Sequence, residues 1–267
     1  MSSILTNTSS MVALQTLKSI NKGMAKVQDE ISTGLKVSTA KDNSSSWSIA
    51  STMSSDVASY KKLGESLTSA SAMVGVARTA AEQVSGILKN IQEKIVQAEN
   101  PDADTTKIQA EVTALTNTIV SIAQSAQYNG INLVSAAGAS QDITVSINRS
   151  AAGALTTGTF TVAASNLEAL GAALVVGTAT PDAIDTLIDT ANTAAAAFGA
   201  AQARIEAQNS FLSKQADALK TGVGAMVDAD MEEASARLSA LQTQQQLGIQ
   251  ALSIANQAPQ NVLSLFR

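Results

Sequence analysis

Two short motifs in this chain combine residue types that can do nucleophilic chemistry. Ser59 to Lys62 (SYKK) fits S-x-x-K, in which a lysine amine activates a serine hydroxyl, and Lys220 to Gly222 (KTG) fits its usual companion in penicillin-binding enzymes. The third motif of that set, S-D-N, does not occur in the sequence. Both stretches show helical periodicity, where K-T-G would need a strand. We therefore expect no catalytic site and no enzyme.

The composition excludes most other chemistry. The 267 residues include no cysteine and no histidine, the usual side chains for thiol catalysis, disulfides and zinc binding. The net charge is −5 without a basic cluster, which argues against nucleic acid or an anionic membrane surface as partner. Short N-x-S/T matches at Asn7, Asn43 and Asn148 arise easily by chance in a chain rich in Ser and Thr, and they leave glycosylation undecided. We expect no cofactor and no metal.

A long helix is predicted from about Ser44 to Ala98. Its apolar residues follow a 3,4 spacing, which is the seam of a coiled coil. They are Tyr60, Leu63, Leu67, Ala70, Val74, Ala77, Ala81, Val84, Leu88, Ile91, Ile95 and Ala98. About 55 residues at 1.5 Å each give roughly 80 Å, which is too long for a compact domain.

Further helices and one hairpin follow. Residues 100–102 (NPD) end the first helix, and a second seam runs from Ile108 to Ala126, opened by Thr106 and Gln109 as a capping box. Alternating residues in 142–147 and 159–163 predict a β-hairpin. Thr180-Pro181 begins a third long helix with every seventh residue apolar from Ile184 to Met226. The fold class is mainly α, with long antiparallel coiled-coil helices and a small β-hairpin.

The two chain ends share an unusual lack of charge. No charged side chain precedes Lys18, and residues 238–266 contain none, although Ser, Thr, Asn and Gln are frequent there. The run is too polar for a membrane span. Solvated helices normally carry Lys and Glu on their outer faces, so neutral ends indicate a surface that copies of the same chain cover on assembly. We expect the terminal helices to pair and order when the chain polymerises.

The expected polymerisation interface consists of large apolar residues in these ends. The amino-terminal seam is ended by Gly34. The interface residues are Leu5, Leu14, Leu17, Ile20, Met24, Val27, Ile31, Leu238, Leu241, Leu247, Ile249, Leu252, Ile254, Val262, Leu263, Leu265 and Phe266.

Four stretches of this sequence are distinctive: SILTNTSSMVALQTL at the start, ISTGLKVSTAKDNSSSWSIA from Ile31 to Ala50, QYNGINL from Gln127 to Leu133, and IANQAPQNVLSLFR at the end. Together they closely resemble bacterial flagellin. The resemblance covers nearly everything outside residues 135–180. It implies a subunit of the flagellar filament used for swimming. A hook-filament junction protein and a helical signalling module of chemoreceptor type are the alternatives.

The resemblance also implies a division of the chain. Residues 1–41 would form the inner-tube helix and spoke, 42–134 the outer-tube helices, and 135–180 a short variable region with the hairpin. Residues 181–228 would return to the outer tube and 229–267 to the inner tube.

The same resemblance implies the partners. We expect no signal peptide, export through the flagellar apparatus with a chaperone, and contacts with cap and junction proteins outside the cell.

The resemblance also bears on the animal innate receptor for flagellin. Stimulating members carry a stretch like LQRVRELAVQSAN, where this chain reads LKNIQEKIVQAEN from Leu88 to Asn100. Gln92 and Lys94 thus replace an arginine and a leucine, while Glu111 is retained in the IQAE stretch. Because both lie off the seam, we expect them to face outward and to give weak or no receptor recognition.

Overall fold

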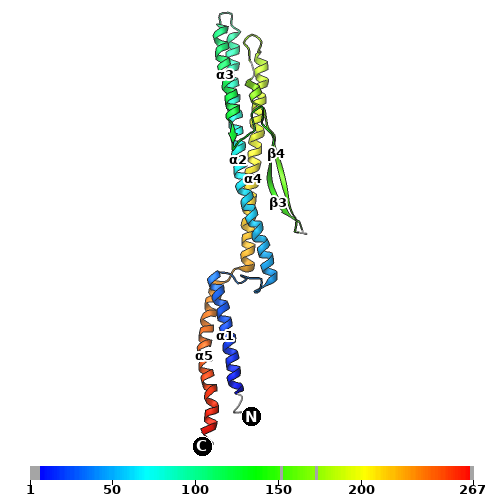
Figure 1. Cartoon of the computed structure of the whole chain (residues 1–267). Coiled ribbons are helices and arrows are strands. Elements are labelled where there is room, and N and C mark those ends of the chain that lie inside the picture. Colours follow the sequence, from blue (N-terminus) through cyan, green and yellow to red (C-terminus); the bar gives the residue numbers. More distant parts are fainter. Residues whose placement is uncertain (1–6, 151–152, 172–173, 265–267) are drawn as a thin grey trace. The chain divides into compact units, whose positions relative to one another are not determined.

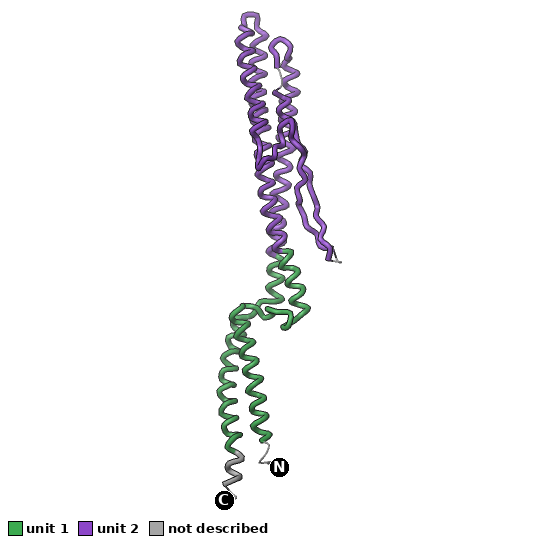
Figure 2. The backbone as a smooth tube through the Cα atoms, viewed as in Figure 1, with its two compact units in different colours: residues 1–56, 218–267 green, residues 57–217 purple. Residues whose placement is uncertain are grey.

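The computed structural model describes residues 7–150, 153–171 and 174–264. The chain forms two compact units (Figure 2). Unit 1 combines Met1–Asp56 with Ala218–Arg267, and unit 2 is Val57–Asp217. Both units are built mainly from long helices, which confirms the expected mainly α fold.

Three long helices run side by side in unit 2 (Figure 1). They belong to α2 (Ser44–Ala98), α3 (Thr105–Ser125) and α4 (Pro181–Val227), whose bounds confirm the three predicted helices. Two hydrogen bonds join α2 to α4: Ser85 Oγ donates to Asn192 Oδ1 at 2.7 Å, and Asn209 Nδ2 donates to Thr68 Oγ1 at 3.2 Å. Since the residue number falls along α2 as it rises along α4, the two helices are antiparallel.

Each of these helices begins at a polar cap. Asn43 Oδ1 accepts from Ser46 N–H at 3.1 Å, Asp104 Oδ1 from Lys107 N–H at 3.2 Å, and Thr180 Oγ1 from Ala183 N–H at 3.3 Å. These bonds satisfy amide groups that have no partner inside the helix. The Thr180 cap confirms the predicted start of α4.

The predicted capping box of α3 is wrong. Asp104 caps the helix, and the Gln109 side chain reaches away to the segment before α4, where its Oε1 accepts from Val176 N–H at 2.6 Å and its Nε2 donates to Leu174 O at 3.2 Å. The Asp104 carboxylate, two residues before Thr106, caps the helix, so the Gln109 amide is left to satisfy the backbone of residues 174–176.

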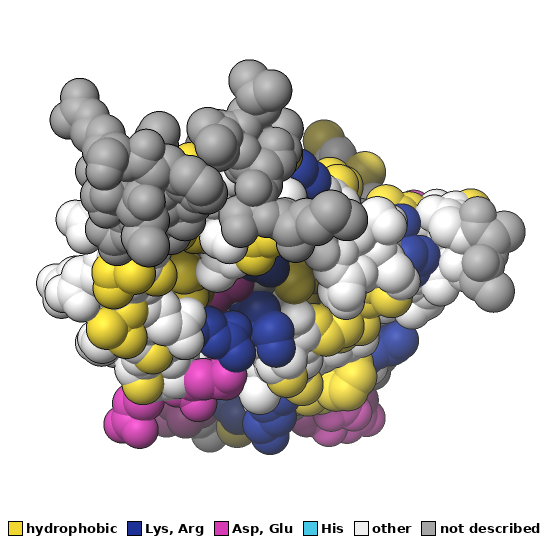
Figure 3. Space-filling view, turned by 90° about the horizontal axis from the view of Figure 1, so that it is seen from below, with side chains coloured by type: hydrophobic (Ala, Val, Ile, Leu, Met, Phe, Trp, Pro, Cys, Tyr) yellow, Lys and Arg dark blue, Asp and Glu magenta, His cyan; other side chains and the backbone are white. Residues whose placement is uncertain are grey.

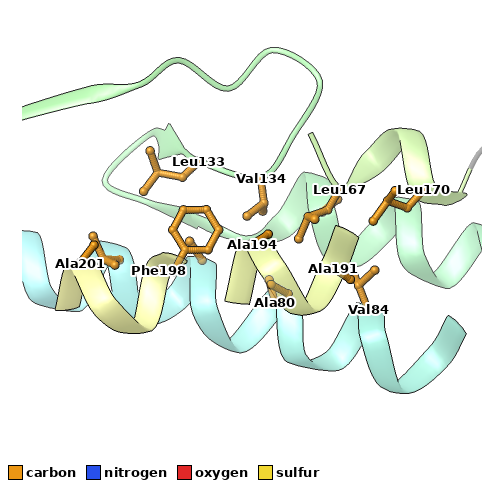
Figure 4. Close-up of a cluster of buried hydrophobic side chains, with 14 of the residues drawn as sticks. Ala80, Val84, Leu133, Val134, Leu167, Leu170, Ala191, Ala194, Phe198 and Ala201 are labelled. Carbon is orange, nitrogen blue, oxygen red and sulfur yellow. The ribbon is translucent and has the colours of Figure 1, made fainter. Parts of the chain in front are cut away.

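The core of unit 2 is a row of small and branched side chains. The predicted seam from Leu63 to Ile95 is buried throughout, and only its outermost members, Tyr60 and Ala98, are half-buried. Phe198 of α4 is 2% exposed and points toward Leu133 and Val134 (Figure 4). Because the other side chains around it are mostly aliphatic, the helices pack closely.

Two small antiparallel sheets follow α3. Strands β1 (Gln127–Tyr128) and β2 (Ile131–Asn132) are joined by Asn129 and Gly130, both with positive φ, as a tight hairpin turn requires. Strands β3 (Gln141–Arg149) and β4 (Leu155–Val162) form the predicted hairpin, with an irregularity between Thr144 and Ser146. A 3₁₀ turn, η1 (Glu168–Gly171), then leads toward α4.

The β3–β4 hairpin packs against the helices of unit 2 through its apolar face. Ile143 and Val162 are buried, and the guanidinium of Arg204 in α4 lies 4.0 Å from the centre of the Phe160 ring. This cation–π contact joins an otherwise thin hairpin to the long helix.

Unit 1 contains the helices α1 (Thr8–Thr33) and α5 (Met231–Ser264), which lie side by side (Figure 1). Asn7 caps the start of α1, and Gly34, with φ of 70°, ends it as predicted. The segment after Gly34 bonds to the end of α4: Lys36 N–H donates to Val227 O at 2.7 Å, and Ala229 N–H donates to Gly34 O at 2.9 Å.

Candidate functional site

Helices α1 and α5 meet through glycines placed opposite large side chains. A β-carbon at Gly248 would lie 3.4 Å from Leu17 Cδ1 and 3.8 Å from Ile20 Cδ1, and one at Gly23 would lie 3.7 Å from Leu241 Cδ1. Each helix therefore offers a gap that the other fills. This reciprocal packing brings the two backbones close together with little buried apolar surface.

Amides and hydroxyls join the same two helices. Asn7 Nδ2 donates to Ala255 O, Ser10 Oγ to Asn256 Oδ1, and Gln245 Nε2 to Asn21 Oδ1, each at 2.8 Å. These bonds account for the many polar but uncharged residues in the chain ends. Neutral donors and acceptors can pair across a close helix contact without the desolvation that an unpaired charge would suffer.

The structure divides the predicted interface residues into two groups. Val27 is buried and seven others are half-buried in unit 1. These seven are Leu17, Ile20, Met24, Ile31, Leu238, Leu241 and Leu252. The other group is exposed: Leu14 at 45%, Leu247 at 58%, Ile249 at 54% and Ile254 at 69%. The first group packs within one chain, and the second is free to contact another.

The remaining predicted interface residues cannot be placed. Leu5, Leu265 and Phe266 lie outside the described residues, and Val262 and Leu263 lie outside the described side chains.

Two exposed residues were missed by the sequence prediction. Met11 is 65% exposed and Val12 is 62% exposed. Both lie off the seam that contains Leu17 and Ile20, so a search for seam positions passes over them. The sequence feature that could have identified them is that both are large apolar residues in the charge-free stretch before Lys18.

The motifs with possible chemistry sit on regular structure. Ser59 and Lys62 lie within α2, and Lys220 to Gly222 lie within α4, where no strand can present a K-T-G. Asn7 and Asn43 are helix caps, and Asn148 lies on β3. Among the described residues no cluster of acidic side chains is arranged to hold a metal ion, and no helix is apolar enough over a sufficient length to span a membrane.

The chain matches two family models that together cover most of its length. Residues 4–139 match the bacterial flagellin N-terminal helical region, and residues 182–266 match the bacterial flagellin C-terminal helical region. A flagellin of Brucella melitensis is 40% identical over 282 residues, with all of both chains covered. Flagellin C of Rhizobium meliloti is 38% identical over 320 residues, again with all of both chains covered.

The chain belongs to the bacterial flagellin family. Another relative, flagellin FljK of Caulobacter vibrioides, is 34% identical over all of this chain and 99% of its own. Among solved structures, a Bacillus cereus flagellin is 20% identical to this chain, with a TM-score of 0.33. The match covers 60% of this chain and 86% of that one, and the family assignment does not depend on it.

As a flagellin, the chain is a structural subunit of the extracellular bacterial flagellar filament and not an enzyme. The expected filament function is confirmed, and the alternatives of a hook-filament junction protein and a chemoreceptor-type signalling module are not supported. Residues 140–181, between the two matched regions, contain the β3–β4 hairpin of this flagellin.

The residues aligned with the receptor-recognition stretch of stimulating flagellins lie in unit 2. Lys94 Nζ is 2.6 Å from Glu111 Oε2, and Gln92 Nε2 donates to Pro181 O at 3.4 Å. Both Gln92 and Lys94 are half-buried, so the expectation that they face outward is met only in part. The retained acid, Glu111, is neutralised by a lysine of its own chain.

Proposed function

We propose that the α1–α5 pair is the polymerisation segment of this flagellin. The observation that supports the proposal is the row of exposed large apolar residues on helices whose ends carry almost no charge. Ile254 and Leu247, seven residues apart on α5, share one face, which their exposure places away from α1. Monomeric proteins rarely leave such residues in water, and copies of the same chain are the partners that a filament supplies.

The inner tube of the filament would then consist of residues 1–41 and 229–267, and the outer tube of 42–134 and 181–228, with the variable region at 135–180. The partial burial of Leu17, Ile20 and Leu241 supports an intrachain role for the seam. The exposed residues Leu14, Leu247, Ile249 and Ile254 would make the contacts between subunits.

Substitution of one exposed isoleucine tests this proposal. In Ile254→Asp, a carboxylate would enter the contact between copies unpaired, at a cost of several kcal/mol per subunit. The matched control is Leu155→Asp, since Leu155 is 52% exposed but lies on the hairpin outside the matched family regions. Purified monomers are added to sheared filament seeds, and growth is followed by sedimentation and negative-stain microscopy. Normal filaments from Ile254→Asp would disprove the proposal.

Export and partners follow the family. We propose that the chain leaves the cell through the flagellar export apparatus with a cytoplasmic chaperone, and meets cap and junction proteins at the growing filament. Pull-down of the purified chaperone by the wild-type chain, and loss of binding when residues 238–267 are removed, would test the first contact.

Recognition by the animal innate receptor is proposed to be weak or absent. The Lys94–Glu111 ion pair supports this, because the acid that matches stimulating flagellins is already occupied.

A further inference from the structure

Two lysines on α1 have no partner among the residues that the structure describes. Lys18 and Lys22 are exposed, and neither forms an ion pair or a side-chain hydrogen bond with another described residue. Each lies two residues from Ile20, which faces Gly248 of α5. Two residues turn a helix by about 200°, so both lysines point away from α5. They form a basic pair on the outer face of α1.

Two acidic residues at or just before the start of α5 also form no ion pair with a described residue. Asp228 and Glu232 are exposed and make no ion pair with a described residue, whereas Glu233 pairs with Arg237 at 2.8 Å and Asp230 caps α5 by accepting from Glu232 N–H at 3.0 Å. Glu232 is nine residues from Leu241, which faces Gly23, so it lies about 180° around the helix and points away from α1. Asp228 precedes α5, with its carboxylate against Gly224 of α4, and we call Asp228 and Glu232 together the acidic pair.

The basic and acidic pairs cannot meet within one chain. Ala229 N–H bonds to Gly34 O, which fixes the acidic pair near the carboxyl end of α1. Lys18 and Lys22 lie about 21 Å earlier along the axis of α1, at 1.5 Å per residue. A lysine side chain spans far less than this. Figure 3 shows side chains of both charges, with apolar ones between them, on the face that is seen from below.

We infer that the basic pair of one copy binds the acidic pair of a second copy displaced by about 21 Å along the helix axis. The inference rests on the proposed role of α1 and α5 in polymerisation. Each copy presents the basic pair to one neighbour and the acidic pair to another, so the contact is heterologous. Head-to-tail contacts of this kind continue without closing and are the type that builds an open filament.

Charge complementarity favours a second copy of the chain as the partner of each charged pair. When neighbouring copies cover α1 and α5, an unpaired lysine or glutamate loses hydration, whereas an opposite charge from the neighbour compensates it. The pairs would also set the stagger between copies, because Lys18 is the first charged residue of the chain and a register that aligned the lysine pairs of two copies would be repulsive.

Charge reversal in two separate variants tests the inference. One variant carries Lys18→Glu and Lys22→Glu, so that both of its groups are acidic, and the other carries Asp228→Lys and Glu232→Lys, so that both are basic. Seeded polymerisation is measured as the critical concentration, for each variant alone and for an equimolar mixture. Circular dichroism of each monomer, compared with wild type, confirms that the helices still form.

Each variant alone is expected to raise the critical concentration by about tenfold or more, through repulsion between copies. The mixture is expected to return to within about threefold of wild type, because each variant then finds opposite charges on the other. Pairing within one chain cannot produce this rescue. Wild-type assembly of either variant would show that the charges face a water-filled channel, and failure of the mixture would show that they do not meet. Either result overturns the inference.

The charge-reversal experiment and the Ile254→Asp experiment can give different outcomes, so the two proposals are tested separately. Rescue by the mixture together with normal assembly of Ile254→Asp would retain the charge contact and reject the apolar contacts.

Discussion

Lys94 Nζ lies 2.6 Å from Glu111 Oε2, and the two residues come from neighbouring helices of unit 2, α2 and α3. The lysine stands where stimulating flagellins carry leucine, so one substitution removes an apolar anchor and also occupies the retained acid. The ion pair is partly solvated, and its worth to the fold is small. We propose that its effect on recognition is larger, since an interface depends on a few anchor residues.

We therefore predict weak receptor stimulation by the monomer and a partial gain for Gln92→Arg with Lys94→Leu. Arginine is among the residues that most often carry interface energy, and its loss at such a position costs roughly 2 kcal/mol or more; the double variant restores the arginine and the apolar side chain. Dose-response curves in a receptor reporter cell line, with endotoxin-free monomer, provide the measurement. Lys89→Leu, an exposed position on the same helix, is the control. Strong stimulation by the wild-type chain would contradict the prediction.

Removal of the carboxyl-terminal helix is predicted to abolish filaments while unit 2 still folds. Deletion of residues 238–267 leaves the three-helix core of unit 2 unchanged, including Phe198 and the buried seam of α2. Thermal unfolding of the truncated monomer should keep the cooperative transition of unit 2, with a loss of helical signal from α1 and α5. Loss of that cooperative transition would show that the terminal helices support the core.

Substitution of Gly248 is predicted to separate α1 from α5. In Gly248→Leu the added atoms meet Leu17 and Ile20, which already lie within 4 Å of a β-carbon there. Overpacking of this kind typically costs 1–3 kcal/mol. Gly86→Leu in α2 is the matched control, since a β-carbon at Gly86 has nothing within 4 Å. Hydrogen exchange of the α1 amides should rise in Gly248→Leu and stay unchanged in Gly86→Leu.

The start of α3 is predicted to weaken in acid. The hydrogen bond from the Lys107 side chain, and then the one from the Lys107 N–H, hold the pKa of Asp104 below its ordinary value of 3.8. Since the folded pKa is lower than the unfolded one, the stabilisation is present above about pH 4 and is lost as the pH falls through the folded pKa. Asp104→Asn should keep the cap but remove this part of the pH dependence, and Asp104→Ala should lose both. Denaturant unfolding between pH 2 and 7 measures the difference, and identical pH profiles for wild type and Asp104→Asn would contradict it.

The sequence was sufficient to predict the elements of this fold. The 3,4 spacing from Tyr60 to Ala98, the N-P-D stop and the Thr180-Pro181 start each report on backbone geometry within a few residues, and the structure has the helices at those bounds. The β3–β4 hairpin was predicted for the same reason, since alternation is a local property of a strand. The capping box at Gln109 failed because Asp104, two residues before Thr106, starts the helix earlier by accepting from Lys107 N–H.

The neutral composition of residues 238–266 was enough by itself to indicate an assembly surface, and the terminal motifs to indicate the family. Which apolar residues pack inside the chain and which stay exposed was decided only by the tertiary structure. Leu17 and Leu247 are alike in type and in neutral surroundings, but Leu17 meets Gly248 while Leu247 points away. Periodicity defines the faces of one helix. The partner of each face depends on contacts between residues more than 200 positions apart, and those form only when α1 and α5 fold against each other.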